Sequence, residues 1–350
     1  MTQTILTASS DFISTALEEL CEADPAITVE KLLGDGVSLV TGPMPFETLS
    51  TRLQKLEPVF LRHICPVWLI HKLREREELA ALTQVLVELP ATARLLSEGV
   101  SFSVQARFLG EDPQHVLTAY AIKEGISQKI IAKFGAIENI KTPEVVVSVA
   151  VYEATAYVGI SKVSQNLSDW AGGMRRFSRE SQQISRAEFK LLEAMDIFGL
   201  KLPDSGSALD LGAAPGGWTR LLLKNGLQVV AVDPAELDPR LNSYTNLRHF
   251  RGHAADYLRL AQKQRRRFDL ILSDMRVDAR TTSELMGQFA NLLPPRGHGL
   301  VTLKLPFASP ALDPVLHMRQ ALTLLRQSFR LVQAKHLFHN RQEVTVFLEK

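Results

Sequence analysis

The stretch SALDLGAAPGGW, residues 207–218, decides the fold of this chain. It reads as a buried strand ending near Asp210, a tight turn from Gly212 to Gly217, and a helix that starts at Trp218. Glycines let the backbone approach a ligand closely, and the first turn of a helix offers free N–H donors. The stretch therefore predicts a ligand site at the carboxyl end of the first strand of an α/β domain.

The segments that follow this turn alternate between strand and helix patterns. Such alternation is typical of a doubly wound α/β domain with a mostly parallel sheet. After the last helical segment, two further strands separated by a short turn predict a terminal antiparallel pair. The predicted strands are 207–212, 227–233, 268–275, 297–305, 329–339 and 343–350.

The upstream half mixes strands and helices as small α+β units. We predict one unit over 1–95, a second over 96–170, and a polar, glycine-containing linker over 171–182 that leads into a domain over 183–350. Four local features are predicted: a single strand over 59–70, a helix broken at Pro90, a helix over 113–135 that ends at Gly135, and two strands that meet at 152–155.

The bulk composition excludes two classes of protein. The chain has 350 residues, 45% hydrophobic and 22% charged, with a net charge of +2. It is therefore neither disordered nor a polycation, and nucleic-acid binding has to come from local basic patches. We expect no metal, because the two cysteines form no Cys/His cluster. With neither a signal peptide nor a membrane span in the pattern, we expect a cytoplasmic protein.

The glycine-rich turn does not by itself identify the cofactor. The order G-A-A-P-G-G departs from the G-x-G-x-x-G of dinucleotide sites, which disfavours an oxidoreductase without excluding it. Asp233 ends the second strand, where an acid can accept two ribose hydroxyls. Both NAD and S-adenosylmethionine carry such a ribose, and a strand-end acid also suits a turn, so Asp233 does not discriminate.

Five segments together resemble the FtsJ-like ribose 2′-O-methyltransferases over residues 183–350. They are SRAEFKLLEA (185–194), LDLGAAPGGW (209–218), DLILSDM (269–275), LVTLKLP (300–306) and NRQEVTVF (340–347). The resemblance implies a Rossmann-like methyltransferase domain that uses S-adenosylmethionine. It also implies a catalytic tetrad made of Lys190, Asp274, Lys304 and Glu343.

The resemblance further implies a set of cofactor-binding residues. Whether His253 or Asp256 contacts the adenine is open, with Asp256 favoured. The full set is Asp210, Gly212, Ala213, Ala214, Pro215, Gly216, Gly217, Trp218, Asp233, His253, Asp256 and Asp274.

The chemistry of the tetrad follows from the weak nucleophilicity of a ribose hydroxyl, which needs a group to accept its proton. We hypothesise that Lys304 is this base, which requires a lowered pKa. Asp274 would hold Lys304, while Lys190 and Glu343 position the hydroxyl. A capping box between Ser185 and Glu188 is predicted to start the helix that carries Lys190.

Basic residues next to the predicted catalytic segments are candidates for phosphate contacts. They are Arg175, Arg176, Arg179, Arg186 and Arg341. Trp170 and Phe177 could stack on bases or simply pack.

The upstream half resembles the ferredoxin-like and THUMP RNA-binding units of a branch that methylates cytidine in 23S large-subunit rRNA. This implies an rRNA substrate, with tRNA as the runner-up. A non-catalytic RNA-binding module stays an alternative, and the oligomeric state is open.

Overall fold

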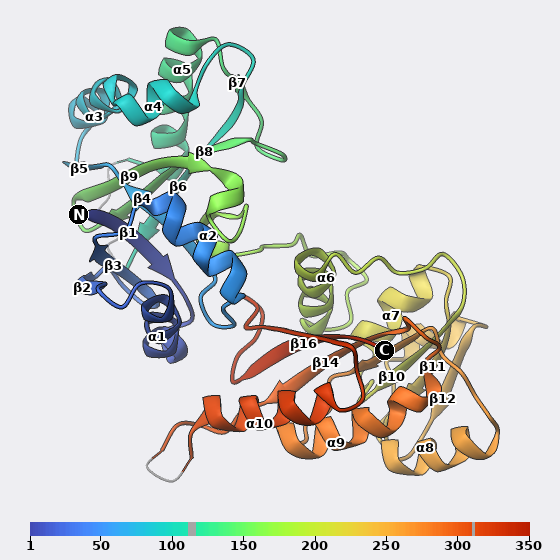
Figure 1. Ribbon diagram of the computed structural model, residues 1–350. Coiled ribbons are helices and arrows are strands. Elements are labelled where there is room, and N and C mark those ends of the chain that lie inside the picture. The colour runs from blue at the N-terminus through green and yellow to red at the C-terminus, as the bar shows by residue number, and fades with distance from the viewer. Residues whose placement is uncertain (111–116, 310–311) are drawn as a thin grey trace. The chain divides into compact units, whose positions relative to one another are not determined.

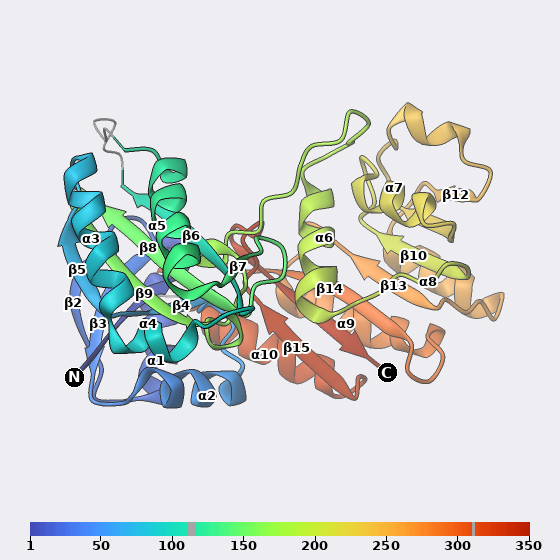
Figure 2. The same ribbon diagram turned by 90° about the horizontal axis from the view of Figure 1, so that it is seen from above.

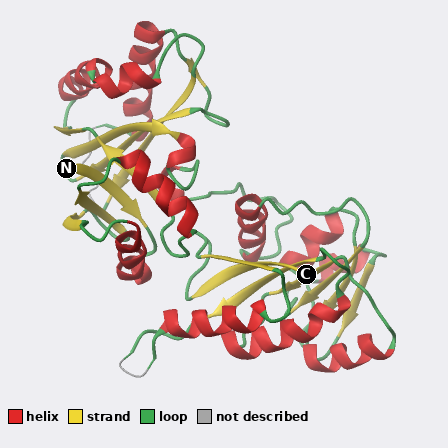
Figure 3. Ribbon diagram, viewed as in Figure 1, coloured by secondary structure: helices red, strands yellow, loops and turns green. Residues whose placement is uncertain are grey.

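The computed structural model describes residues 1–110, 117–309 and 312–350, and it divides into two compact units (Figures 1 and 3). The units are Met1–Arg175 and Arg176–Lys350. The division falls inside the range predicted as a linker, 171–182. No helix in the described ranges is long and apolar enough to span a membrane.

The N-terminal unit begins with a four-stranded antiparallel sheet of order β2-β3-β1-β4. Two of its strands were missed by the sequence analysis. Strand β1 (TQTILT) contains only two apolar residues, which are adjacent, and every residue of β2 is exposed, so neither shows an alternating apolar pattern. The elements are β1 (Thr2–Thr7), α1 (Ile13–Ala23), β2 (Thr28–Leu32), β3 (Val37–Gly42), α2 (Phe46–Leu56) and β4 (His63–Val67).

A second, mixed sheet of order β5-β9-β8-β6-β7 completes this unit, with α3, α4 and α5 covering one face (Figure 2). Its central strand β8 is buried along seven consecutive residues, which requires apolar cover on both sides. The elements are β5 (Leu69–Lys72), α3 (Arg76–Glu88), α4 (Pro90–Leu95), β6 (Ser101–Leu109), α5 (Ala119–Phe134), β7 (Ile137–Glu138), β8 (Val145–Tyr152) and β9 (Thr155–Lys162).

The single strand predicted over 59–70 is wrong. The segment forms β4 in the first sheet and β5 in the second, with a break at Trp68, whose N–H donates to Val158. Since α3 and α4 also pack on the second sheet, residues 69–95 belong to it, and the predicted boundary at 95/96 lies too late.

Other local predictions for this unit are confirmed. The helical region breaks at Pro90, α5 ends at Gly135 with φ of +66°, and β8 and β9 meet at a short turn after Tyr152. The start of the helix predicted over 113–135 lies partly outside the described residues.

The C-terminal unit is built on a seven-stranded sheet of order β12-β11-β10-β13-β14-β16-β15. Strands β12, β11, β10, β13 and β14 run parallel, so the strand order reverses between β10 and β13, where ligands bind in open α/β sheets. The strands are β10 (Ser207–Leu211), β11 (Gln228–Val232), β12 (Leu247–Phe250), β13 (Leu270–Ser273), β14 (His298–Lys304), β15 (Leu331–Lys335) and β16 (Glu343–Glu349).

Helices cover both faces of this sheet, with α6 and α7 on one face and α8, α9 and α10 on the other (Figure 1). The amphipathic pattern of each helix turns its apolar side to the strands; Leu191, Trp218 and Leu222 pack over Leu272. The helices are α6 (Ala187–Phe198), α7 (Gly217–Lys224), α8 (Ala254–Lys263), α9 (Ala279–Phe289) and α10 (Pro314–Arg326).

The start of α6 differs from the prediction. The helix begins at Ala187 with Arg186 as N-cap, and no side chain caps it. Glu188 instead accepts the N–H of Ile184 and pairs with the buried Arg220, so the capping box with Ser185 does not form. The ion pair wins because a buried guanidinium needs a carboxylate partner.

The last strand, β16, lies inside the sheet and runs antiparallel to both of its neighbours. Residues 343–348 are buried on both faces, which explains the apolar run at the end of the sequence. The register places Glu343 opposite Lys304, so the strand order itself brings these two side chains together.

We predict that Leu348→Ala lowers the free energy of unfolding by about 2–5 kcal/mol, because a fully buried side chain leaves a cavity. Leu316→Ala is the matched control: Leu316 is 49% exposed on α10, and its truncation should cost less than about 0.5 kcal/mol. Urea unfolding followed by circular dichroism measures both. Equal losses in the two variants would show that β16 does not hold the sheet together.

Candidate active site

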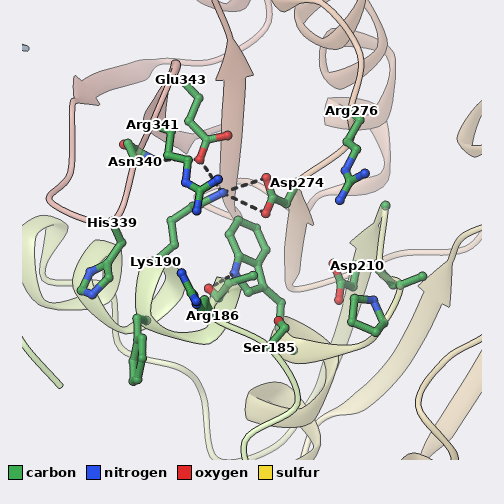
Figure 4. Close-up of a pocket in the computed structure, with 18 of the residues that line it drawn as sticks. Ser185, Arg186, Lys190, Asp210, Asp274, Arg276, His339, Asn340, Arg341 and Glu343 are labelled. Carbon is green, nitrogen blue, oxygen red and sulfur yellow. Dashed lines mark hydrogen bonds and ion pairs between the residues drawn. The ribbon is translucent and has the colours of Figure 1, made fainter. Parts of the chain in front are cut away.

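A pocket of about 640 Å³ opens at the carboxyl ends of β10, β13 and β14 (Figure 4). Its volume is in the range of ordinary ligand sites. The lining residues are Ser185, Arg186, Ala187, Phe189, Lys190, Asp210, Gly212, Ala213, Ala214, Pro215, Gly217, Trp218, Asp274, Arg276, Lys304, Phe338, His339, Asn340, Arg341 and Glu343.

The glycine-rich turn forms one wall of this pocket. Gly212 has φ of +75°, and a Cβ atom there would lie 2.8 Å from the Cα of Met275, so only glycine fits. Helix α7 begins at Gly217 directly after the turn, and its first N–H groups have no partner within the helix. The wall therefore offers donors and open backbone to a ligand.

Asp210 lies at the base of the turn and is completely buried. Its Oδ2 accepts a hydrogen bond of 2.6 Å from Thr219. Burial raises the pKa of Asp210 to about 7, assisted by the negative charges of Asp274 and Asp233 and opposed by the hydrogen bond from Thr219. This carboxyl group therefore changes protonation near neutral pH.

The four residues of the predicted tetrad form a closed ring of alternating charge. Lys190 Nζ lies 3.0 Å from Asp274 Oδ2 and 2.6 Å from Glu343 Oε1. Lys304 Nζ lies 2.7 Å from Asp274 Oδ1 and also binds Glu343 Oε2. Each carboxylate thus contacts both ammonium groups, and Figure 4 shows Lys190 reaching between the two acids.

A second layer of hydrogen bonds orients the two carboxylates. Thr302 donates to Asp274 over 2.6 Å. Asn340 donates to Glu343 over 3.4 Å and to Thr345 over 3.1 Å. These contacts fix the acids before any ligand arrives, which is how precise sites are supported.

The pKa of Lys304 is raised, opposite to the direction expected from its proposed role as base. Burial lowers the pKa of Lys304, but the charges and hydrogen bonds of Asp274 and Glu343 outweigh it. For Asp274 burial raises the pKa, while Lys190, Lys304 and Thr302 outweigh it and bring it below its ordinary value. The ring as it stands therefore holds Lys304 protonated.

Four predicted cofactor residues do not line the pocket: Gly216, Asp233, His253 and Asp256. Asp233 accepts the N–H groups of Ala214 and Ala235, at 3.1 and 2.8 Å, and so braces the turn. Asp256 pairs with Arg259 on the surface, and His253 precedes α8 as its N-cap. The other predicted cofactor residues all line it.

Of the five predicted phosphate-binding arginines, four are exposed and one is buried. Arg186 and Arg341 are exposed and lie at the pocket, and Arg176 and Arg179 are exposed elsewhere. Arg175 is buried and pairs with Asp169 over 2.8 Å, because its guanidinium serves packing within the N-terminal unit. This conformation does not offer Arg175 to a phosphate.

Several pocket residues were missed by the sequence analysis: Ser185, Phe189, Arg276, Phe338, His339 and Asn340. The signal that could have found His339 and Asn340 is their place just before Arg341 and Glu343. Ser185 Oγ is buried and has no hydrogen-bond partner among the residues that the structure describes, so it can bind a polar ligand atom. No metal-binding group of three or more His, Cys, Asp or Glu side chains exists in the described ranges.

The profile of the FtsJ-like methyltransferases matches residues 183–329. Ribosomal RNA large subunit methyltransferase M of Shewanella putrefaciens is 30% identical over 296 residues, which cover 77% of this chain and 79% of that protein. The chain belongs to the FtsJ-like methyltransferase family.

Further relatives share the same name. The proteins of Shewanella sediminis and Haemophilus influenzae are 33% and 32% identical, over 57% and 55% of this chain. These two matches span only 56% and 54% of the relatives' own length. The solved structure of TrmN from Thermus thermophilus is similar over 100% of both chains, with a TM-score of 0.42 and 19% identity, and the family assignment does not rest on it.

Family membership makes S-adenosylmethionine the cofactor of this chain, and the pocket fits it. The approach at Gly212 leaves bare backbone on one wall, the buried hydroxyl of Ser185 lacks a partner, and the volume suits a nucleoside-sized ligand. The residues that would hold it are Asp210 and the turn residues that line the pocket, which are Gly212, Ala213, Ala214, Pro215 and Gly217.

We predict that Asp210→Asn flattens the dependence of stability on pH between about 4 and 7. In this window the folded chain keeps the Asp210 proton, whereas the unfolded chain, with its ordinary pKa of 3.8, has lost it. The contribution of Asp210 to stability therefore falls as pH rises, by an amount on the order of a few kcal/mol. Asparagine can still accept from Thr219 but cannot ionise.

Melting temperatures across this pH range measure the effect, with Asp204→Asn on an exposed loop as the control. If Asp210→Asn follows the wild-type slope, the shifted pKa of Asp210 is wrong.

Proposed function

We propose that the chain transfers a methyl group from S-adenosylmethionine to a ribose 2′-hydroxyl of RNA. One observation carries the proposal: the ring of Lys190, Asp274, Lys304 and Glu343 lies in the same pocket as the glycine-rich turn. A pocket that combines a cofactor wall with fixed acids and ammonium groups can hold a donor and activate a hydroxyl side by side.

When bound, S-adenosylmethionine supplies a sulfonium methyl group that an oxygen nucleophile can take. The 2′-oxygen would take this methyl group as the carbon–sulfur bond breaks, and a group of the chain would accept the hydroxyl proton. We assign this proton to Lys304 Nζ, with Asp274 and Glu343 stabilising the ammonium that results. Acid–base groups of this kind contribute about 10²–10⁴-fold to the rate.

The raised pKa of Lys304 sets a condition on this role, because only the neutral amine can accept a proton. Burial already lowers this pKa, and the two carboxylates reverse the effect. An added positive charge in the pocket opposes the carboxylates and lowers the pKa of Lys304. The base therefore becomes available only in the loaded site.

We assign recognition of the cofactor's ribose to Asp233, which lies at the end of β11 and braces the turn through Ala214. Asp256 is assigned to the adenine end in preference to His253. Neither residue lines the pocket: Asp233 is half-buried and Asp256 is exposed, and we propose that both reach the cofactor through a local rearrangement on binding.

The N-terminal unit is proposed as the RNA reader. Its first sheet has the element order β-α-β-β-α-β of a ferredoxin-like unit, over residues 1–68. Residues 69–170 are assigned as THUMP-like. The names of the relatives support large-subunit rRNA as the substrate, and tRNA is the second candidate. Arg176, Arg179, Arg186 and Arg341 are assigned to phosphates.

The function is tested by methyl transfer from labelled S-adenosylmethionine to unmodified large-subunit rRNA and, separately, to unmodified tRNA. Nucleosides from the digested product are separated by mass spectrometry. We expect a 2′-O-methylated nucleoside from rRNA with wild type. Lys304→Met should retain cofactor binding and lose at least about 100-fold in rate, because the proton acceptor is gone. A methylated base in place of the ribose would refute the proposal.

We predict that Glu343→Gln moves the rising limb of the pH–rate profile to lower pH. Glu343 is one of two carboxylates that raise the pKa of Lys304, so its neutralisation should lower that pKa. The rate of single-turnover methyl transfer, measured across pH, gives the position of the rising limb. The short reaction time limits the exposure of the RNA to alkali.

The control is Glu349→Gln on the same strand, where the carboxylate pairs with Arg330. A limb that stays in place in Glu343→Gln would mean that Lys304 is not the titrating group.

A further inference from the structure

We infer that His339, oriented by Glu193 and flanked by Phe189 and Phe338, contacts the base of the nucleotide that is methylated. The inference rests on the proposed function and names its base subsite. Phe189, Phe338 and His339 all line the pocket. Figure 4 shows His339 on the same side of the pocket as Asn340 and Arg341.

Glu193 is a carboxylate buried without a lysine or arginine partner in the described parts of the chain. It is 1% exposed and accepts three hydrogen bonds from one turn: the N–H of Phe338 at 2.7 Å, the N–H of His339 at 3.0 Å and Nδ1 of His339 at 2.7 Å. A buried acid is costly unless it is fully hydrogen-bonded, so this arrangement fixes the turn firmly.

The contact with Glu193 also determines the tautomer of His339. Because Nδ1–H donates to the carboxylate, the other ring nitrogen, Nε2, acts as an acceptor in the neutral imidazole. No protein group in the described ranges binds Nε2, although the side chain is largely buried. An acceptor nitrogen held in a fixed orientation at a pocket wall can read an N–H edge of a ligand.

Aromatic rings surround His339. Its ring centroid lies 5.4 Å from Phe189, 5.9 Å from Phe177 and 5.1 Å from Phe338, the last in an edge-on arrangement. All four rings are only partly buried, so they form a surface as well as a packed cluster. Aromatic faces of this kind hold unstacked bases of single-stranded RNA.

The aromatic residues around His339 are well placed to contact the base of a nucleotide whose ribose lies at the tetrad. Glu193 and Lys190 lie one turn apart on α6, so one helix orients both the wall and the ring of charges. Asn340 follows His339 and donates to Glu343. Arg186 and Arg341 lie in the same pocket for the phosphates. Base, ribose and phosphate thus each find a matching group, and the ligand class is an unpaired nucleotide presenting an N–H donor.

The test compares His339→Ala, His339→Phe and Glu193→Gln with His317→Ala, a half-buried histidine on α10 that does not line the pocket. The RNA is the fragment that the wild type methylates, together with versions that carry each other base at the target position. We measure kcat and KM for each RNA and, by calorimetry, the affinity for S-adenosylhomocysteine. That affinity should stay within about twofold in every variant, since the wall does not hold the cofactor.

We expect His339→Ala to raise KM for the RNA by about tenfold or more, the size of a lost base stack. His339→Phe should recover part of this loss but reduce the preference for the natural base, because phenylalanine stacks without accepting a hydrogen bond. Glu193→Gln, a change at a positioning residue, should reduce the same preference. His317→Ala should match the wild type.

Unchanged KM and unchanged base preference in His339→Ala would overturn the inference while leaving the proposed function intact. A different outcome tests the proposed function: if the wild-type protein methylates no ribose, the proposed function is refuted before the His339 variants are compared. If Glu193→Gln fails to fold, the pair of His339 variants alone decides.

Discussion

The pairing of β16 with β14 is the constraint on which the site depends. It places Glu343 opposite Lys304, which also contacts Asp274. Because side chains alternate along a strand, a slip of one residue would turn Glu343 to the other face and break the ring. The hydrophobic residues 344, 346 and 348 therefore secure a charged contact at the end of their own strand.

The ring behaves as one electrostatic unit. Two ammonium groups and two carboxylates balance, and each carboxylate touches both lysines. The charges of Asp274 and Glu343 raise the pKa of Lys304, and the charges of Lys190 and Lys304 lower the pKa of Asp274, so each charge acts on its neighbours in the ring. The influence extends to Asp210, whose raised pKa owes part of its shift to Asp274, and so links the floor of the cofactor turn to the ring.

Local patterns predicted the strands around the turn at 212–217 and, through the resemblance, the four residues that the structure brings together. Local patterns did not predict side-chain partners or pKa shifts that depend on residues far apart in the sequence. Glu188 pairs with Arg220 instead of capping α6, and the raised pKa of Lys304 depends on acids far away in sequence. Glu193 and His339 are 146 residues apart, and no spacing rule joins them.

The contact between Gly212 and Met275 has one more consequence. The two backbones almost touch there, and the N–H of Asp274 binds the carbonyl of Leu211 at 3.0 Å. The residue before the glycine and the residue before the methionine are thus locked as a pair. A methyl group on residue 212 would push the two strand ends apart and carry the Asp274 carboxylate with them. The absence of a side chain at Gly212 therefore sets the distance between the cofactor turn and the carboxylate of Asp274.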